Sequence, residues 1–141
     1  MVALIDTNVI MNFLLGRDDP QSEASAQIIR RCVLGEYAGV IAFHTLSTVW
    51  YAERRSSEEM RRNDLRTICR IFRVSAASHE KAAAAVDNAD FRDFEDCLQY
   101  ICAESAEADY IVTCNIRDYE KSPISALIPS DFAAVLDSLN N

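Results

Sequence analysis

The N-terminal stretch that decides the fold reads Val2-Ala3-Leu4-Ile5-Asp6-Thr7-Asn8-Val9-Ile10-Met11. Its first four residues form a run too short and too uniformly apolar for a half-exposed segment, so they predict a central strand of a parallel sheet. Asp6-Thr7-Asn8 then ends the strand with side chains suited to capping a helix. In open α/β sheets, ligands bind beyond the carboxyl ends of the strands. Asp6 is therefore either a helix cap or part of a functional site, and the stretch alone favours neither.

The rest of the chain predicts strands and helices in alternation. Apolar runs that predict strands lie at residues 37–43, 73–76 and 108–113, with 127–128 as an edge-strand candidate. Apolar residues at helical spacing lie at 22–34, 44–55, 57–72, 79–89, 94–107 and 129–139. Such alternation is typical of a parallel sheet between two helical layers. We predict an α/β fold, a three-layer α/β/α sandwich with a mainly parallel central sheet, built as a single domain over residues 1–141.

The composition is that of an ordinary globular protein, with 50% hydrophobic and 26% charged residues. No apolar run approaches the ~20 residues of a membrane span, and no signal-peptide pattern is evident. The five cysteines are odd in number and never spaced as C-x-x-C, so they indicate reduced, buried side chains and not a disulfide framework or a zinc site. We therefore expect a cytoplasmic protein without a membrane partner.

The net charge of −8 would repel a bare phosphate backbone, so a nucleic-acid partner requires bound cations or a local basic patch. Half of the fourteen positive charges lie between residues 54 and 73: Arg54, Arg55, Arg61, Arg62, Arg66, Arg70 and Arg73. These arginines form either a patch that faces RNA or a solvated helix face that pairs with neighbouring acids. The sequence leaves both interpretations open.

Three aspartates are predicted to reach the same edge of the sheet. Asp6 follows one strand, Asp118 lies in the loop after another, and Asp96 lies in the first turn of the helix between. Asp93, just before that helix, is a candidate cap. Clustered carboxylates repel one another unless a cation compensates their charge. Oxygen-only ligands suit Mg²⁺ or Mn²⁺, and such ions activate water and stabilise an in-line displacement at phosphorus.

Other catalytic chemistries have less support in the sequence. The chain has no glycine-rich phosphate loop, which disfavours an enzyme driven by nucleoside triphosphates. Its two histidines, His44 and His79, lie in no recognisable catalytic setting, and we expect them to be structural or exposed. A phosphotransfer or phosphatase domain with Asp6 as nucleophile is disfavoured because Thr7-Asn8 follows, in place of a second aspartate.

Three motifs resemble those of PIN-domain proteins. Leu4–Ile10 resembles the opening motif of that family, and Asp93–Gln99, Ala108–Asn115 and Arg117–Tyr119 resemble its C-terminal half, in the same order and at similar spacing. The resemblance covers essentially the whole chain and implies a parallel sheet with helices on both sides. The best-known members are metal-dependent ribonucleases, and many are the toxin half of bacterial toxin–antitoxin pairs, the VapC type.

Carried over residue by residue, the resemblance implies that Asp6, Asp96 and Asp118 are the catalytic, metal-binding acids, with Mg²⁺ or Mn²⁺ as cofactor. The resemblance also implies which polar residues support these acids or contact the substrate: Asn8, Thr113 and Asn115. We add Asp93 to this supporting group, because it brings a further negative charge to the start of the same helix as Asp96.

One position of the resembled family is not matched. Its nucleases usually carry a glutamate early in the helix after the second strand, close to Thr48 in this chain. The nearest acid, Glu53, lies five residues later. Five residues turn a helix by roughly 500°, which leaves Glu53 about 140° from the face of Thr48. We therefore expect Glu53 to lie outside the acidic site, as a solvated residue beside Arg54 and Arg55.

Two functions remain open. The first is a Mg²⁺- or Mn²⁺-dependent endoribonuclease that cleaves RNA, as a toxin with an antitoxin partner. The second is a catalytically weak or inactive PIN-fold protein that binds RNA or a protein. The three acids favour the first function, whereas the change at Thr48 and the net charge of −8 favour the second. Surplus apolar residues at 11–15 and 60–72, with Trp50 and Tyr51, also predict a homodimer, which the resemblance implies as well.

Overall fold

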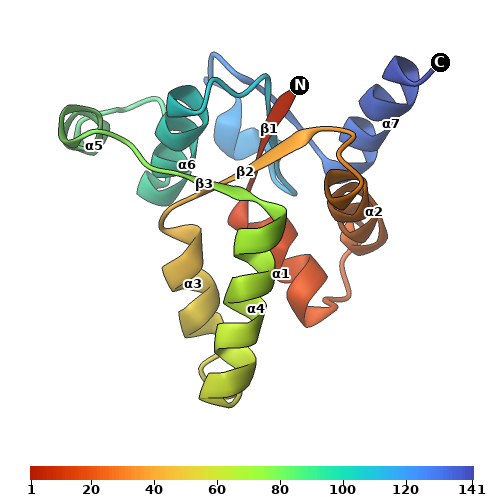
Figure 1. Ribbon diagram of the computed structural model, residues 1–141. Coiled ribbons are helices and arrows are strands. Elements are labelled where there is room, and N and C mark those ends of the chain that lie inside the picture. The colour runs from red at the N-terminus through yellow and green to blue at the C-terminus, as the bar shows by residue number, and fades with distance from the viewer.

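The computed structural model describes all 141 residues, with a five-stranded sheet covered by helices on both faces (Figure 1). The strands are β1 (Val2–Ile5), β2 (Ala38–Ala42), β3 (Arg73–Ser75), β4 (Tyr110–Val112) and β5 (Ser125–Leu127). They lie in the order β3-β2-β1-β4-β5, and all four neighbouring pairs are parallel. The predicted α/β fold class and the central place of β1 are confirmed.

Seven α-helices and one 3-10 helix connect the strands: α1 (Thr7–Leu15), α2 (Ser22–Val33), α3 (Thr45–Ala52), α4 (Glu58–Ile71), α5 (His79–Val86), α6 (Phe94–Ser105), η1 (Ile116–Tyr119) and α7 (Pro129–Leu139). Apolar residues of α1, α2, α4 and α7 form one core with β1, and those of α5, α6 and η1 form a second core. Because side chains of a strand alternate between its faces, Ala3 and Ile5 belong to the first core and Leu4 to the second. No helix has the length and apolar character needed to cross a membrane.

Some elements are shorter than the sequence predicts. The strand expected at 108–113 is limited to Tyr110–Val112, since only these residues pair with β1, from Ala3↔Tyr110 to Ile5↔Val112. The helix expected at 79–89 ends at Val86. Asp87 and Asn88 follow it, and their N–H groups close short turns onto the carbonyls of α5. Both residue types compete with the helix for backbone hydrogen bonds, which explains the early end.

The carboxyl ends of β1, β2 and β4 lie at one edge of the sheet, because the three strands are parallel neighbours. α1 begins directly after β1, α3 begins three residues after β2, and η1 follows β4 after a short loop. α3 and α4 project beyond this edge, toward the lower part of the view in Figure 1. The edge is therefore the place where side chains from separate parts of the sequence can meet.

Candidate functional site

Asp6 occupies the N-cap position of α1 but does not cap that helix with its side chain. Its Oδ2 instead accepts hydrogen bonds from Thr113 Oγ1, at 2.8 Å, and from Tyr119 Oη, at 2.9 Å. The residue is only 5% exposed, so both bonds are shielded from water. The carboxylate thus points toward Thr113, after β4, and Tyr119 of η1, and its side chain forms no cap hydrogen bond with α1.

Asp96 and Asp118 approach the same place from α6 and η1. Tyr119 Oη, which bonds Asp6, lies 3.4 Å from Asp96 Oδ1. Burial, and then the charges of Asp6, Asp118 and Asp93, raise the pKa of Asp96 from its ordinary 3.8 to about 7, and a hydrogen bond with Asp118 acts in the same direction. Burial likewise raises the pKa of Asp6, against the opposing hydrogen bonds from Thr113 and Tyr119. The three acids are close enough to destabilise one another's ionised forms.

The predicted supporting residues hold these acids in different ways. Asn8 Nδ2 lies 3.3 Å from Thr113 Oγ1, and Asn8 Oδ1 accepts from the backbone N–H of Cys114 at 3.1 Å. Asn115 Nδ2 donates to Asp118 Oδ2 at 2.8 Å. Asn8 therefore ties α1 to the loop after β4, and Asn115 orients Asp118.

Asp93 caps α6, as predicted for it. Its Oδ1 accepts from the backbone N–H of Glu95 at 2.7 Å, and the residue itself is exposed. Its charge contributes to the raised pKa of both Glu95 and Asp96. Asp93 thus adds negative potential at the rim of the site and fixes the first turn of α6.

Tyr119 is a member of the site that sequence reasoning missed. Its ring is 2% exposed, and its hydroxyl group lies between Asp6 and Asp96. Burial and these two negative charges raise the pKa of Tyr119 far above its usual value, so the hydroxyl group keeps its proton. A buried tyrosine needs a hydrogen-bond partner for its O–H group. The sequence signal that could have identified Tyr119 as part of the site is its position next to Asp118.

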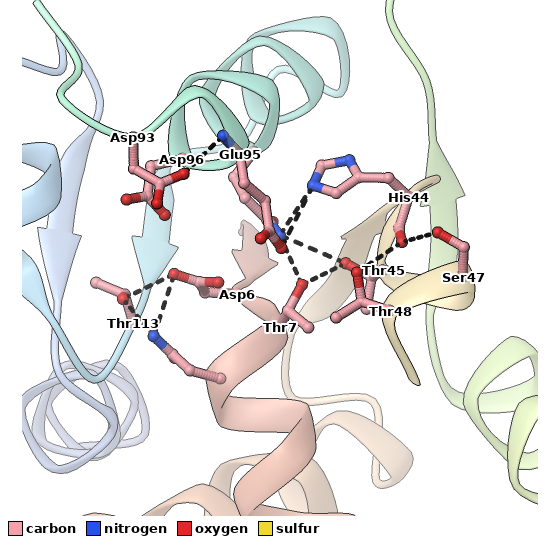
Figure 2. Close-up of polar contacts among 12 residues, drawn as sticks. Asp6, Thr7, His44, Thr45, Ser47, Thr48, Asp93, Glu95, Asp96 and Thr113 are labelled. Carbon is pink, nitrogen blue, oxygen red and sulfur yellow. Dashed lines mark hydrogen bonds and ion pairs between the residues drawn. The ribbon is translucent and has the colours of Figure 1, made fainter. Parts of the chain in front are cut away.

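His44 and Glu95 lie on the other side of Asp6, toward α3 (Figure 2). Glu95 contributes to the raised pKa of Asp6, and His44 Nε2 lies 3.9 Å from Glu95 Oε1. Burial lowers the pKa of His44, while the charge of Asp6 opposes this shift. Neither residue was expected in the site, because only the packing of α6 against the end of β2 brings them beside Asp6.

A buried polar network closes this side of the site. Gln99, one turn after Glu95 on α6, is fully buried, and its Nε2 donates to Thr7 Oγ1 at 2.7 Å. Thr7 Oγ1 in turn lies 2.9 Å from Thr45 Oγ1, at the start of α3. The network joins α1, α3 and α6 beside Asp6, and Figure 2 shows its contact between Thr7 and Thr45 on the side of Asp6 that faces His44.

α3 supplies no carboxylate to the acids. Thr48 Oγ1 donates to the carbonyl of His44 within the same helix, at 3.2 Å. Glu53 lies at the C-terminal end of α3 and contacts Asp64 of α4, and no contact links it to the three aspartates. The expected solvated setting of Glu53 is wrong: the residue is 6% exposed, because it is enclosed between α3 and α4.

The donor set fits a hard divalent cation in its chemistry. Asp6, Asp96 and Asp118 offer oxygen ligands only, and none of them forms an ion pair with a basic side chain. No three acidic, histidine or cysteine side chains are already arranged so that they could together hold a metal ion. The hydroxyl group of Tyr119 instead links two of the acids.

Comparison with known proteins gives a clear result at the level of family. A family model of the PIN domain matches residues 2–117, a stretch that contains Asp6 and Asp96 and ends one residue before Asp118. A comparison with curated protein sequences gives no match.

Solved structures with a similar fold include two VapBC structures and one toxin–antitoxin complex. The chain is similar to VapBC-1 from nontypeable Haemophilus influenzae, with a TM-score of 0.69, 15% sequence identity, and coverage of 92% of this chain and 99% of that chain. It is also similar to a toxin–antitoxin complex from Klebsiella pneumoniae, with a TM-score of 0.64, 18% identity, and coverage of 90% and 97%. VapBC2 from Rickettsia felis, bound to a DNA fragment from its promoter, gives a TM-score of 0.62 at 15% identity, with coverage of 91% and 98%.

At such low identity, these structures speak for the fold alone, and their near-complete coverage agrees with the parallel sheet described above. The match to the PIN-domain family model spans most of the sequence. It includes β1, which decides the fold, and the helix α6 that carries Asp96. The chain belongs to the PIN-domain family.

Proposed function

We propose that this protein is an endoribonuclease that hydrolyses RNA phosphodiester bonds with Mg²⁺ or Mn²⁺ as cofactor. The observation that carries the proposal is the mutual approach of Asp6, Asp96 and Asp118, from the end of β1, from α6 and from η1. Burial, and then the charges of Asp6 and Asp118, raise the pKa of Asp96 to about 7. A protein rarely gathers three carboxylates without a compensating charge, and perturbed acids in such a place point to function.

Asp6, Asp96 and Asp118 would hold the divalent cation, which supplies an activated water and stabilises charge on the phosphate oxygens. Thr113 and Tyr119 orient Asp6, and Asn115 orients Asp118. Glu95 brings a fourth carboxylate to the side of Asp6 that faces α3, where the expected glutamate is missing at Thr48. The chain's own part in the reaction is thus to position oxygen ligands and to keep Asp6 shielded from water.

The biological setting that we propose is a toxin–antitoxin pair in the cytoplasm. One of the similar structures is described as a toxin–antitoxin complex and two others as VapBC, which supports an antitoxin as protein partner. Large apolar side chains that remain exposed on α1, α3 and α4 support a homodimer as the assembled form.

A second candidate function is binding without efficient cleavage. The observation that favours it is local: Thr48 bonds within its own helix, and α3 delivers no carboxylate to the acids. In this case the protein would bind RNA or a protein partner, and the acids would retain a cation without fast turnover.

Cleavage of labelled RNA by the purified protein tests the proposal. We expect cleavage with Mg²⁺ or Mn²⁺, none with chelator, and a loss of at least ~100-fold for Asp6→Asn, because the ligand that is most firmly fixed then carries no charge. Asp18→Asn, in an exposed loop, is the matched control and should cleave as the wild type does. If the folded protein cuts no RNA in any metal across varied sequences, the binding function replaces the nuclease.

A further inference from the structure

A polar cavity of about 430 Å³ lies beside η1, a volume in the range of ligand pockets. Its lining residues are Ala89, Asp90, Arg92, Arg117, Asp118, Glu120 and Lys121. Only Ala89 is apolar, and the other six are all charged. A cavity of this kind has no apolar wall to hold a ring or an alkyl chain, so its ligand must be recognised through charge.

Three cations from two segments meet in this cavity. Arg92 comes from the loop before α6, whereas Arg117 and Lys121 come from η1 and the turn after it. None of the three lies within 4.0 Å of a carboxylate, because the chain's ion pairs involve only Arg31, His44, Arg62 and Lys81 among the basic residues. Their N–H groups are therefore available to a ligand, although three acids share the cavity wall.

The cavity shares one residue of η1, Asp118, with the acidic site. Asp118 lines the cavity and also hydrogen-bonds Asn115 and raises the pKa of Asp96. The next residue, Tyr119, is anchored between Asp6 and Asp96. η1 thus presents its buried side to the acids and its charged side to the cavity. A group that binds Arg117 in this cavity lies against the same wall as Asp118.

Two arginines of α4, Arg61 and Arg62, are less available than the cations of the cavity. Arg61 donates from Nε to the carbonyl of Trp50 at 3.1 Å, and its guanidinium lies 3.6 Å from the centre of the indole ring. Arg62 pairs with Glu58 at 2.8 Å. Part of the basic stretch at 54–73 is therefore occupied by contacts within the chain, which favours its interpretation as a structural helix face.

We propose that Arg92, Arg117 and Lys121 form a phosphate subsite that binds a backbone phosphate of single-stranded RNA next to the bond that is cut. The inference rests on the proposed nuclease function and assigns it a substrate-positioning surface. The lining offers no aromatic ring and no amide side chain to read a base. Contacts to phosphate position a nucleic acid without reading its sequence, so the subsite supplies affinity and register, not sequence choice.

Binding of a labelled single-stranded RNA, measured by fluorescence anisotropy in chelator, separates this subsite from catalysis. We expect the triple variant Arg92→Ala/Arg117→Ala/Lys121→Ala to bind at least ~10-fold more weakly, since it loses charge-assisted hydrogen bonds. The slope of log K against log salt should fall by about 0.7, because the subsite neutralises one phosphate and each phosphate contact on a single strand contributes about 0.7. All three residues are exposed, so thermal melting should stay unchanged.

The matched control is Arg66→Ala/Arg70→Ala/Arg73→Ala, which removes the same charge from exposed positions on α4 and β3. It should weaken binding by less than ~3-fold, through the change in overall charge alone. Equal weakening by both triple variants would overturn the subsite. Inorganic phosphate at millimolar concentration should not displace the RNA. Displacement from the wild type would mark the cavity as a site for free anions and would also overturn the proposal.

The outcomes distinguish the subsite from the nuclease function. If the wild type cleaves RNA while the cavity variant binds and cleaves equally well, the subsite is wrong and the nuclease stands. If the wild type cleaves no RNA but the cavity variant alone loses RNA affinity, the subsite stands and the nuclease is wrong.

Discussion

The hydroxyl group of Tyr119 is the contact that Asp6 and Asp96 share, at 2.9 Å from the first and 3.4 Å from the second. A hydroxyl group has one proton, so it donates to one carboxylate at a time, and the shorter distance assigns it to Asp6. With the pKa of Asp96 raised to about 7, a protonated Asp96 can in turn donate to the Tyr119 oxygen. One side chain therefore fixes the spacing of two acids.

Tyr119→Phe keeps the ring but removes this link. We expect the free energy of unfolding to fall by about 1–2 kcal/mol, because the buried carboxylate of Asp6 loses one of its two short hydrogen bonds. RNA cleavage should fall as well, since Asp6 is less firmly oriented. Chemical denaturation and initial cleavage rates measure the two effects. Tyr110→Phe is the control, because the hydroxyl group of Tyr110 has no hydrogen-bond partner; an equal loss there would contradict the role given to Tyr119.

At the scale of an element, α3 differs most from the expectation. Its acid, Glu53, is buried against α4, and its Oε2 has no hydrogen-bond partner. Burial, and then the hydrogen bond and the charge of Asp64, raise the pKa of Glu53 from 4.5 to about 7, against the opposing charge of Arg61. The end of α3 thus serves the packing of the two helices, and a pH-dependent stability follows from it.

Glu53→Gln should raise the free energy of unfolding at about pH 8 by about 1–2 kcal/mol, and should give no gain at about pH 5. The folded protein holds this proton more tightly than the unfolded chain does. The stabilising contribution is therefore complete below the unfolded pKa, about 4.5, and is lost as the pH rises through about 7. Urea denaturation at both pH values measures the effect. As a control, Glu59→Gln at an exposed position should change the free energy of unfolding equally at the two pH values. An effect of Glu53→Gln that is the same at both pH values would refute this explanation.

Elements with a local signal were predictable from the sequence. β1 has its apolar run, and α4 has Ser57, whose side chain accepts from the N–H of Met60 as a cap. Asp6, Asp96 and Asp118 were predictable as neighbours because parallel strands end at one edge. The contact of Tyr119 with Asp6 was not, because it joins residues 113 positions apart and depends on side-chain directions set by packing. The burial of Glu53 and the places of His44 and Glu95 escaped prediction for the same reason.

At the scale of the whole molecule, apolar surface remains on the helices that project beyond the sheet edge. Tyr51 and Met60 are 66% and 56% exposed on α3 and α4. Trp50, by contrast, is covered by Arg61 and contributes less free surface than the sequence suggested. Exposed large apolar side chains on an acidic monomer favour burial against a second copy.

We expect sedimentation at micromolar concentration to show a dimer. Met60→Glu should shift it to monomer, because a charge at the centre of an apolar interface is costly to bury. Val33→Glu, with a similarly exposed residue on α2, should leave the dimer intact. A monomer in the wild type would remove the homodimer from the proposed assembly.

Binding of Mn²⁺ followed by electron paramagnetic resonance tests most directly the claim that β1, α6 and η1 build one cation site. Wild type and Asp18→Asn should bind the ion alike. Each of Asp6→Asn, Asp96→Asn and Asp118→Asn should bind at least ~10-fold more weakly, because each removes one charged oxygen ligand from the same ion. Unchanged Mn²⁺ affinity in all three variants, with the fold intact, would contradict the account.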